Sequence, residues 1–168
     1  SFTDVSTLGE FGLIEALTKD NPSKHLSTIK GIGDDAAVIK NEEEVTVIST
    51  DMLVEGIHFD LMYTPLKHLG YKAVVVNLSD IYAMNGQPKQ IVVGLGLSNR
   101  FSLEAIEELF NGMLIACKHY GVDLIGGDTS TSQKGFIISV TALGEVAPDT
   151  FVTRSGEQKG DLLCVTGD

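Results

Sequence analysis

The chain has 168 residues, of which 43% are apolar and 21% charged, a composition typical of a globular domain with a hydrophobic core. Its formal net charge of −11 argues against nucleic acid and anionic membranes as partners, because both select basic surfaces. Neither a signal peptide nor an apolar run of membrane length is apparent. Cys117 and Cys164 lack metal-ligand spacing, so we expect two buried free thiols in a reducing cytoplasm.

Helical and extended patterns alternate through the first half of the chain. The elements expected there are a helix at 8–17, strands at 36–39 and 45–51, a short extended piece at 57–59, and a helix from Pro65 to about Met84. Pro is tolerated in the first turn of a helix, and Asn85-Gly86 provides a stop signal after the last one.

The second half of the chain also mixes both kinds of element. The elements expected there are a strand at 91–97, a helix at 102–120 with Ser102 as N-cap, and strands at 122–125, 136–146 and 162–165, the last followed by a turn at 166–168. Strands adjacent in places favour an α+β fold, a mixed sheet flanked by helices, over a regular doubly wound sheet. Because the chain stops where a further helix is due, we expect it to be the front part of a longer protein.

Four short motifs place a carboxylate beside small or hydroxylated residues. They are Gly-Ile-Gly-Asp-Asp-Ala at 31–36, Ser-Thr-Asp at 49–51, Asn-Leu-Ser-Asp at 77–80 and Gly-Gly-Asp-Thr at 126–129. Asp and Gly also suit turns, which is sufficient to explain any one motif alone. Four such motifs, expected at strand ends or on a helix face, favour a shared site instead, because strand ends of one sheet can converge. Carboxylate oxygens are the ligands that Mg²⁺ prefers.

The acidic motifs also indicate how a phosphorylated ligand would be held. The chain lacks a phosphate-cradling lysine loop, so divalent ions would have to bridge carboxylates and phosphates. Arg154 could fork onto a phosphate or stack on a base, or it could be a surface residue without a role. His58 lies between two apolar residues and either packs as a hydrogen-bonded residue or contacts a ligand.

Taken in order, the motifs closely resemble those of the thiamine-monophosphate kinase family, in the aminoimidazole ribonucleotide synthetase superfamily. The resemblance is carried by the four acidic motifs together with Glu-Gly-Ile-His-Phe at 55–59 and Thr-Arg-Ser-Gly at 153–156. It implies ATP-dependent phosphorylation of thiamine monophosphate to thiamine diphosphate with several Mg²⁺ ions. Because the acceptor is a phosphate monoester with a second pKa of about 6, it is mostly dianionic at pH 7. Direct in-line transfer then needs no general base.

The resemblance also assigns roles to particular residues. The metal ligands that it implies are Asp35, Ser49, Thr50, Asp51, Asp80 and Asp128. Gly127 and Arg154 would contact ATP, and His58 the thiamine phosphate.

The resemblance further implies a domain organisation. Residues 1–150 would form the N-terminal ATP- and metal-binding domain and residues 151–168 the start of a C-terminal domain that is otherwise absent. Members of the family pair as homodimers through their N-terminal sheets, with ATP near the dimer seam. Two alternatives stay open: another ATP-using enzyme of the superfamily, and a non-catalytic Mg-nucleotide-binding dimerisation module.

Overall fold

The computed structural model of the chain describes residues 12, 15, 17, 25–32, 34–41, 45–98 and 100–165. Gly12, Glu15 and Leu17 are helical, and the rest of the helix expected at 8–17 lies outside the described residues, as does the turn expected at 166–168. The elements along the chain are β1 (Thr28–Lys30), β2 (Ala37–Lys40), β3 (Val45–Val54), α2 (Leu66–Ala83), β4 (Gln87–Leu97), α3 (Leu103–Tyr120), β5 (Asp123–Thr131) and β6 (Ile137–Val146).

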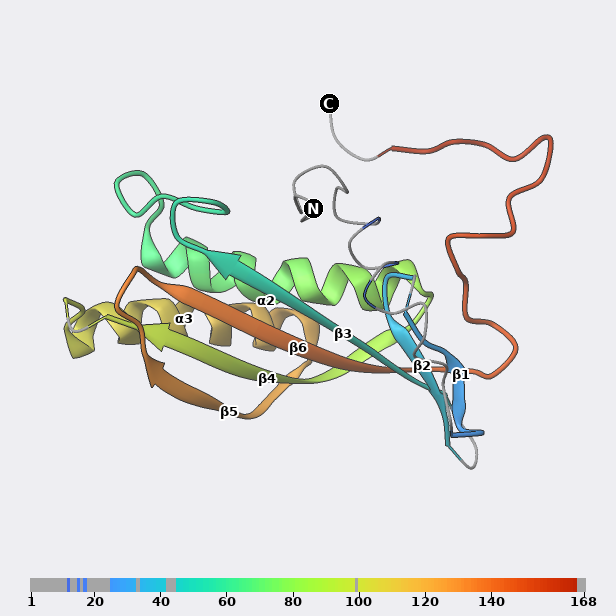
Figure 1. Ribbon diagram of the computed structural model, residues 1–168, viewed down its shortest axis with the longest axis horizontal. Helices are drawn as coiled ribbons and strands as arrows, with labels where there is room; N and C mark the ends of the chain where they lie inside the picture. The colour runs from blue at the N-terminus through green and yellow to red at the C-terminus, as the bar shows by residue number, and fades with distance from the viewer. Residues whose placement is uncertain are drawn as a thin grey trace, which may run out of the picture.

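Within the described residues, six strands form one mixed sheet in the order β1-β2-β3-β6-β4-β5 (Figure 1). Only β4 and β5 run parallel; the other neighbours are antiparallel. The last strand in sequence, β6, lies between β3 and β4 and pairs with both along its length. The predicted α+β fold with a mixed sheet is therefore confirmed.

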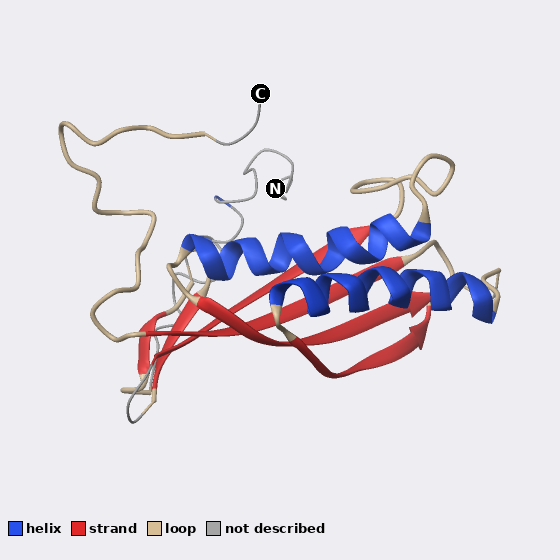
Figure 2. Cartoon of the chain, turned by 180° about the vertical axis from the view of Figure 1, so that it is seen from behind, coloured by secondary structure: helices blue, strands red, loops and turns tan. Residues whose placement is uncertain are grey.

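Both long helices lie on the same face of the sheet, as Figure 2 shows from behind. They pack closely because each helix has a glycine against the backbone of the other helix. A Cβ at Gly70 would lie 2.0 Å from the carbonyl oxygen of Leu109, and one at Gly112 would lie 1.8 Å from that of Lys67. The buried apolar core fills the space between these helices and the sheet. This packing fixes α2 over β3 and β6, where the site described below is found.

Alternation along the strands separates a face covered by the helices, here called the helix face, from an open face. In β3, Val47, Ser49 and Leu53 are buried on the helix face. Thr50 and Met52 project to the opposite side, and Met52 is 55% exposed. Lateral neighbours in a sheet share a face, so the strand register extends this division to β6, β4 and β5.

The two long helices are where the sequence predicted them. Pro65 is the N-cap of α2, and Asn85 has a φ of 59° just after Met84, as expected for a stop signal. Ser102 caps α3 by accepting a hydrogen bond from the backbone nitrogen of Ala105. None of the helices in the described ranges is long and apolar enough to span a membrane.

Other predictions require correction. Residues 162–165 form no strand and are exposed, because no described strand pairs with them, so Cys164 is exposed whereas Cys117 is buried as expected. Residues 56–58 form a turn rather than an extended piece. The strands β3 and β5 continue beyond the motifs expected to end them, so Asp51 and Asp128 lie within strands. The strand β1 was not predicted from the sequence.

Candidate active site

Three of the predicted ligands, Asp35, Asp51 and Asp80, converge from the loop before β2, from β3 and from α2, and are called here the acidic cluster. Ser49 lies among them, and its Oγ donates a hydrogen bond of 2.6 Å to Oδ2 of Asp80. Burial raises the pKa of the Asp80 carboxyl, and the nearby charges of Asp51 and Asp35 raise it further, against the lowering effect of the Ser49 hydroxyl. The cluster therefore gathers negative charge that a cation would relieve.

Asn77 holds Asp51 against α2, a role that the sequence analysis missed. Its Oδ1 accepts a 2.9 Å hydrogen bond from the backbone nitrogen of Asp51, and its Nδ2 donates one of 2.9 Å to the carbonyl oxygen of Ala73. The side chain is only 1% exposed. A buried asparagine whose amide oxygen and amide nitrogen are both hydrogen-bonded rigidifies its surroundings. The spacing of Asn77 and Asp80 on one helix face was the available signal.

The two adjacent aspartates of the 31–36 motif have different surroundings. Asp34 has a side chain that is 1% exposed; it forms an ion pair with Lys30 and accepts hydrogen bonds from the backbone nitrogens of Asp35 and Arg154, both at 3.1 Å. Burial raises the pKa of Asp34, but these bonds outweigh it and leave that pKa below its usual value. Asp34 therefore anchors the loop, whereas Asp35 belongs to the acidic cluster.

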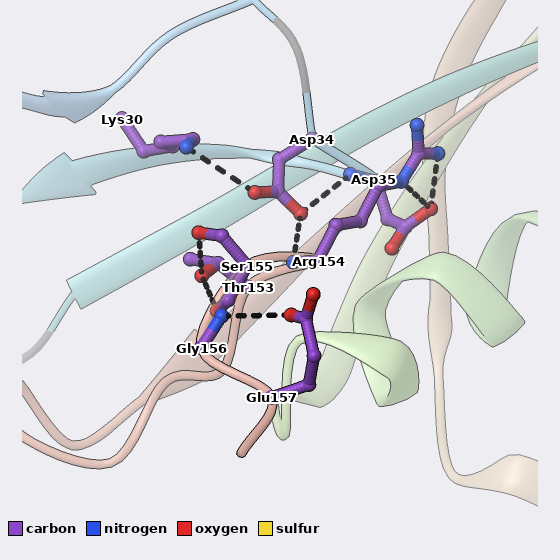
Figure 3. A network of polar contacts seen from close by, with 8 residues as sticks. All are labelled: Lys30, Asp34, Asp35, Thr153, Arg154, Ser155, Gly156 and Glu157. Atoms are coloured by element: carbon purple, nitrogen blue, oxygen red, sulfur yellow. Dashed lines mark hydrogen bonds and ion pairs between the residues drawn. The ribbon is translucent and has the colours of Figure 1, made fainter. Parts of the chain in front are cut away.

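Arg154 supplies a positive charge beside the acidic cluster (Figure 3). Its Nε donates a 3.0 Å hydrogen bond to Oδ1 of Asp35, and its Nη2 forms an ion pair with the same oxygen. The Asp35 carboxylate raises the pKa of Arg154, with smaller contributions from Asp34 and Asp80. Among the described residues, no three His, Cys, Asp or Glu side chains are placed to hold a metal ion. Direct coordination would therefore require the carboxylates to draw closer.

Thr50 belongs to the other side of the sheet. Its hydroxyl donates to the carbonyl oxygen of Val140 at 3.2 Å and lies 2.9 Å from the hydroxyl of Thr141, on the open face. Alternation in a strand sends neighbouring side chains to opposite faces. The hydroxyl of Thr50 therefore does not join the acidic cluster with Ser49 and Asp51, and only its carbonyl oxygen stays available as a ligand.

Asp128 and Gly127 lie on β5, the edge strand at the far side of the sheet. Asp128 pairs with Gly94, which pairs with Ser139, so Asp128 belongs to the open face. The strands β6 and β4 separate β5 from β3, a distance of about 14 Å at the usual strand spacing. Within one chain, the structure does not bring Asp128 together with the acidic cluster.

The predicted ATP contact Gly127 borders a cavity of about 290 Å³. The cavity lies between β5 and α3 and is lined by Val93, Leu95, Phe110, Leu124 and residues 126–129. A Cβ at Gly127 would lie 1.9 Å from the carbonyl oxygen of Val93, so glycine is required for β5 to approach β4 here. Phe110 was missed in the sequence because an aromatic residue within an amphipathic helix is ordinarily part of the core.

His58 stands in the turn at residues 55–59, called here the His58 turn. Its Nδ1 accepts a 3.0 Å hydrogen bond from the backbone nitrogen of Val54, which leaves the proton on Nε2. Lys72 of α2 donates a 3.1 Å hydrogen bond to the carbonyl oxygen of His58. At the start of the turn, Glu55 forms an ion pair with Arg100 and accepts a 2.8 Å hydrogen bond from the backbone nitrogen of Phe136.

The fold and the cluster define an α+β domain that gathers carboxylates and a hydroxyl where β3 meets α2. A family model described as AIR synthase related protein, N-terminal domain, matches residues 33–146. The chain belongs to this family and carries its N-terminal domain.

Named relatives extend the comparison. The chain is 37% identical over 162 residues to thiamine-monophosphate kinase of Bacillus subtilis, covering 96% of this chain and 50% of that protein. It is 38% identical to the Aquifex aeolicus protein of the same name, covering 95% of this chain and 49% of that protein. A solved structure described as AaThiL complexed with AMPPCP and TMP superposes with a TM-score of 0.83 at 36% identity, covering 94% of this chain and 48% of the other. The chain spans about half the length of the curated relatives it matches.

Proposed function

We propose that the protein carrying this chain phosphorylates thiamine monophosphate to thiamine diphosphate with ATP, as a thiamine-monophosphate kinase. The observation that carries the proposal is the convergence of Asp35, Asp51 and Asp80, with Ser49, at the junction of β3 and α2. The named relatives and the neighbour described as complexed with AMPPCP and TMP support the choice of substrates.

The residues of the acidic cluster suit Mg²⁺. They offer carboxylate and hydroxyl oxygens, the donors that this ion prefers. Burial, and then the charges of Asp51 and Asp35, already raise the pKa of Asp80. Asp35, Asp51, Asp80 and the Ser49 hydroxyl would hold the ions, with the backbone carbonyl of Thr50 as a further ligand. When bound, Mg²⁺ would neutralise phosphate charge and align the transferring group.

The chain's own residues then bind and orient rather than transfer protons. An oxygen of the dianionic acceptor would attack the γ-phosphorus in line, and the bond to the bridging oxygen would break to release ADP, so no side chain has to act as general base. Arg154 offers the planar fork that suits phosphate oxygens, and its present partner Asp35 keeps it beside the acidic cluster. Gly127 and the cavity against Phe110 are suited to take the nucleotide, because an aromatic wall and a side-chain-free backbone allow a base to approach closely.

A homodimer that pairs through the N-terminal sheets would reconcile the position of Asp128 with a metal-binding role. A nucleotide at the cavity beside β5 is separated from the acidic cluster of its own chain by β4 and β6. In such a dimer, Asp128 and the nucleotide of one copy would serve the acidic cluster of the other. Each site would then draw residues from both chains.

The domain boundary near residue 150 and the cytoplasmic location are parts of the same proposal. Along the chain, the last described strand of the sheet, β6, ends at Val146, and the described residues after it pair with no strand. They return to the domain through Val152, whose backbone nitrogen donates a 3.2 Å hydrogen bond to the carbonyl oxygen of Met84, and through Arg154. The two free thiols suit a reducing compartment.

The test is a product assay on the protein expressed at the length of its relatives. With ATP, Mg²⁺ and thiamine monophosphate we expect equal amounts of ADP and thiamine diphosphate, and none when a chelator replaces Mg²⁺. Conversion of ATP without thiamine diphosphate would instead favour another ATP-using enzyme of the superfamily.

The half-length coverage of the relatives favours one second candidate for the chain by itself, a non-catalytic Mg-nucleotide-binding dimerisation module. Calorimetry of the 168-residue chain with MgATP distinguishes the two candidates when it is followed by the product assay. Binding without turnover supports the module.

A further inference from the structure

Lys72 connects the His58 turn to α2. Its Nζ donates a 3.1 Å hydrogen bond to the carbonyl oxygen of His58. The turn itself closes through two hydrogen bonds to the carbonyl oxygen of Val54, from the backbone nitrogens of Ile57 at 3.1 Å and His58 at 2.9 Å. The Lys72 side chain is exposed, so its ammonium stabilises the turn without filling the core.

The same turn fixes how His58 presents its imidazole. Because Nδ1 accepts the hydrogen bond from the backbone nitrogen of Val54, Nε2 carries the proton and can donate to an anion. Its ring orientation depends on the turn that Lys72 holds. A displacement of the turn would therefore move the N–H donor away from its target.

Lys72 lies on the helix that also builds the acidic cluster. It precedes Asp80 by eight residues, which places the two about 12 Å apart along the axis of α2 and about a quarter turn apart around it. The helix is held rigidly against α3 by the contacts of Gly70 and Gly112. The helix α2 thus sets the separation between the carboxylates and the His58 turn.

We propose that Lys72 is a positioning residue for the phosphate acceptor. It holds the His58 turn at a fixed separation from the acidic cluster. Nε2 of His58 can then reach the acceptor while the acceptor's phosphate lies at the acidic cluster. The inference rests on the proposed function and adds a residue to it. The nucleotide, bound beside β5 at the far edge of the sheet or by Arg154, does not depend on this turn.

The test compares Lys72→Met with Lys72→Arg in the protein expressed at the length of its relatives. Methionine keeps the stem but removes the ammonium, so we expect KM for thiamine monophosphate to rise about tenfold, the effect of losing one charged hydrogen bond. The KM for ATP should stay within twofold, because the nucleotide contacts are elsewhere. Lys72→Arg, which can still donate to the carbonyl oxygen of His58, should restore most of the loss.

Lys67→Met is the matched control, since Lys67 is exposed on the same helix but has no described contact with the His58 turn. A double-mutant cycle with His58→Ala separates positioning from a direct role of Lys72. Once His58 is removed, Lys72→Met should raise the KM for the acceptor by less than twofold. Urea unfolding of each variant checks that stability is retained.

The outcomes distinguish this inference from the proposed function. A wild-type protein that makes no thiamine diphosphate contradicts the proposed function and this role with it. An active wild type whose KM for the acceptor is unchanged in Lys72→Met refutes only the role of Lys72. An equal rise in the KM for both substrates, or an effect of Lys72→Met that persists in full without His58, also refutes positioning through the turn.

Discussion

The strands β3 and β5 carry similar sequence motifs but place them in different surroundings. Ser-Thr-Asp on β3 and Gly-Gly-Asp-Thr on β5 both lie inside strands. On β3, Asp51 belongs to the helix face and lies beside Asp80 of α2 and the loop that carries Asp35. On β5, Asp128 lies at the sheet edge on the open face. A motif therefore specifies the kind of ligand, whereas topology decides which ligands share a site.

The largest expected effect comes from the β3 side. In the protein expressed at the length of its relatives, Asp51→Asn or Asp80→Asn should lower kcat at least about a hundredfold, because a ligand of the Mg²⁺ that would neutralise the transition-state charge is lost. Circular dichroism should show an unchanged fold. Asp149→Asn, an exposed aspartate outside the acidic cluster, is the control. Near-normal turnover of either cluster variant would count heavily against the proposed function.

A mixing experiment tests whether the β5 side serves a second copy. Asp51→Asn and Asp128→Asn should each be inactive alone, yet a random mixture should regain about a quarter of wild-type activity. Half of the dimers formed are mixed, and in each of these one site has both substitutions and the other has neither. Activity that does not return on mixing would mean that both residues act in the same chain, or that Asp128 has no role.

The packing of β5 against β4 can be tested through stability alone. A Cβ at Gly127 would lie 1.9 Å from the carbonyl oxygen of Val93, whereas one at Gly126 meets nothing within 4 Å. We expect Gly127→Ala to lower the free energy of unfolding by about 2 kcal/mol and Gly126→Ala by less than about 0.5 kcal/mol. Urea unfolding curves measure both. Equal effects would show that the register placing Asp128 on the open face is wrong.

The sequence predicted the kinds of element and all three carboxylates of the acidic cluster, but not the neighbours of each strand. The helix α2 and its stop at Asn85 followed from apolar periodicity and turn chemistry, which are local. Strand order is not local: β6 enters between β3 and β4 from the end of the domain, and so separates Asp128 from Asp51.

Strand ends and isolated strands were the other source of error. Thr50 and Asp51 looked like a strand end because polar residues are rare in buried strands. The strand β3 nevertheless continues to Val54, and the backbone nitrogen of Asp51 donates a hydrogen bond to Asn77 of α2. The apolar residues 162–165 looked like a core strand, but a strand forms only where a neighbour pairs with it, and none is described there.

The smallest expected effect concerns Asp80. When metal is absent, removal of its charge should raise the free energy of unfolding. Because burial and the charges of Asp51 and Asp35 raise the pKa of Asp80 above its usual value of 3.8, the folded state binds this proton more tightly than the unfolded chain. The ionised carboxylate thus lowers stability above the folded-state pKa. That cost disappears as pH falls from this raised pKa towards 3.8.

Asp80→Asn should therefore raise the free energy of unfolding of the 168-residue chain at pH 7.5 in chelator, by less than about 1 kcal/mol since the group is partly exposed. At pH 3.5 the gain should vanish. Asp128→Asn, outside the acidic cluster, should change little at either pH. A loss of stability in Asp80→Asn at pH 7.5 would mean that Ser49 and Arg154 stabilise the carboxylate more than its neighbours repel it. The acidic cluster would then be a structural network, not a site held ready for a cation.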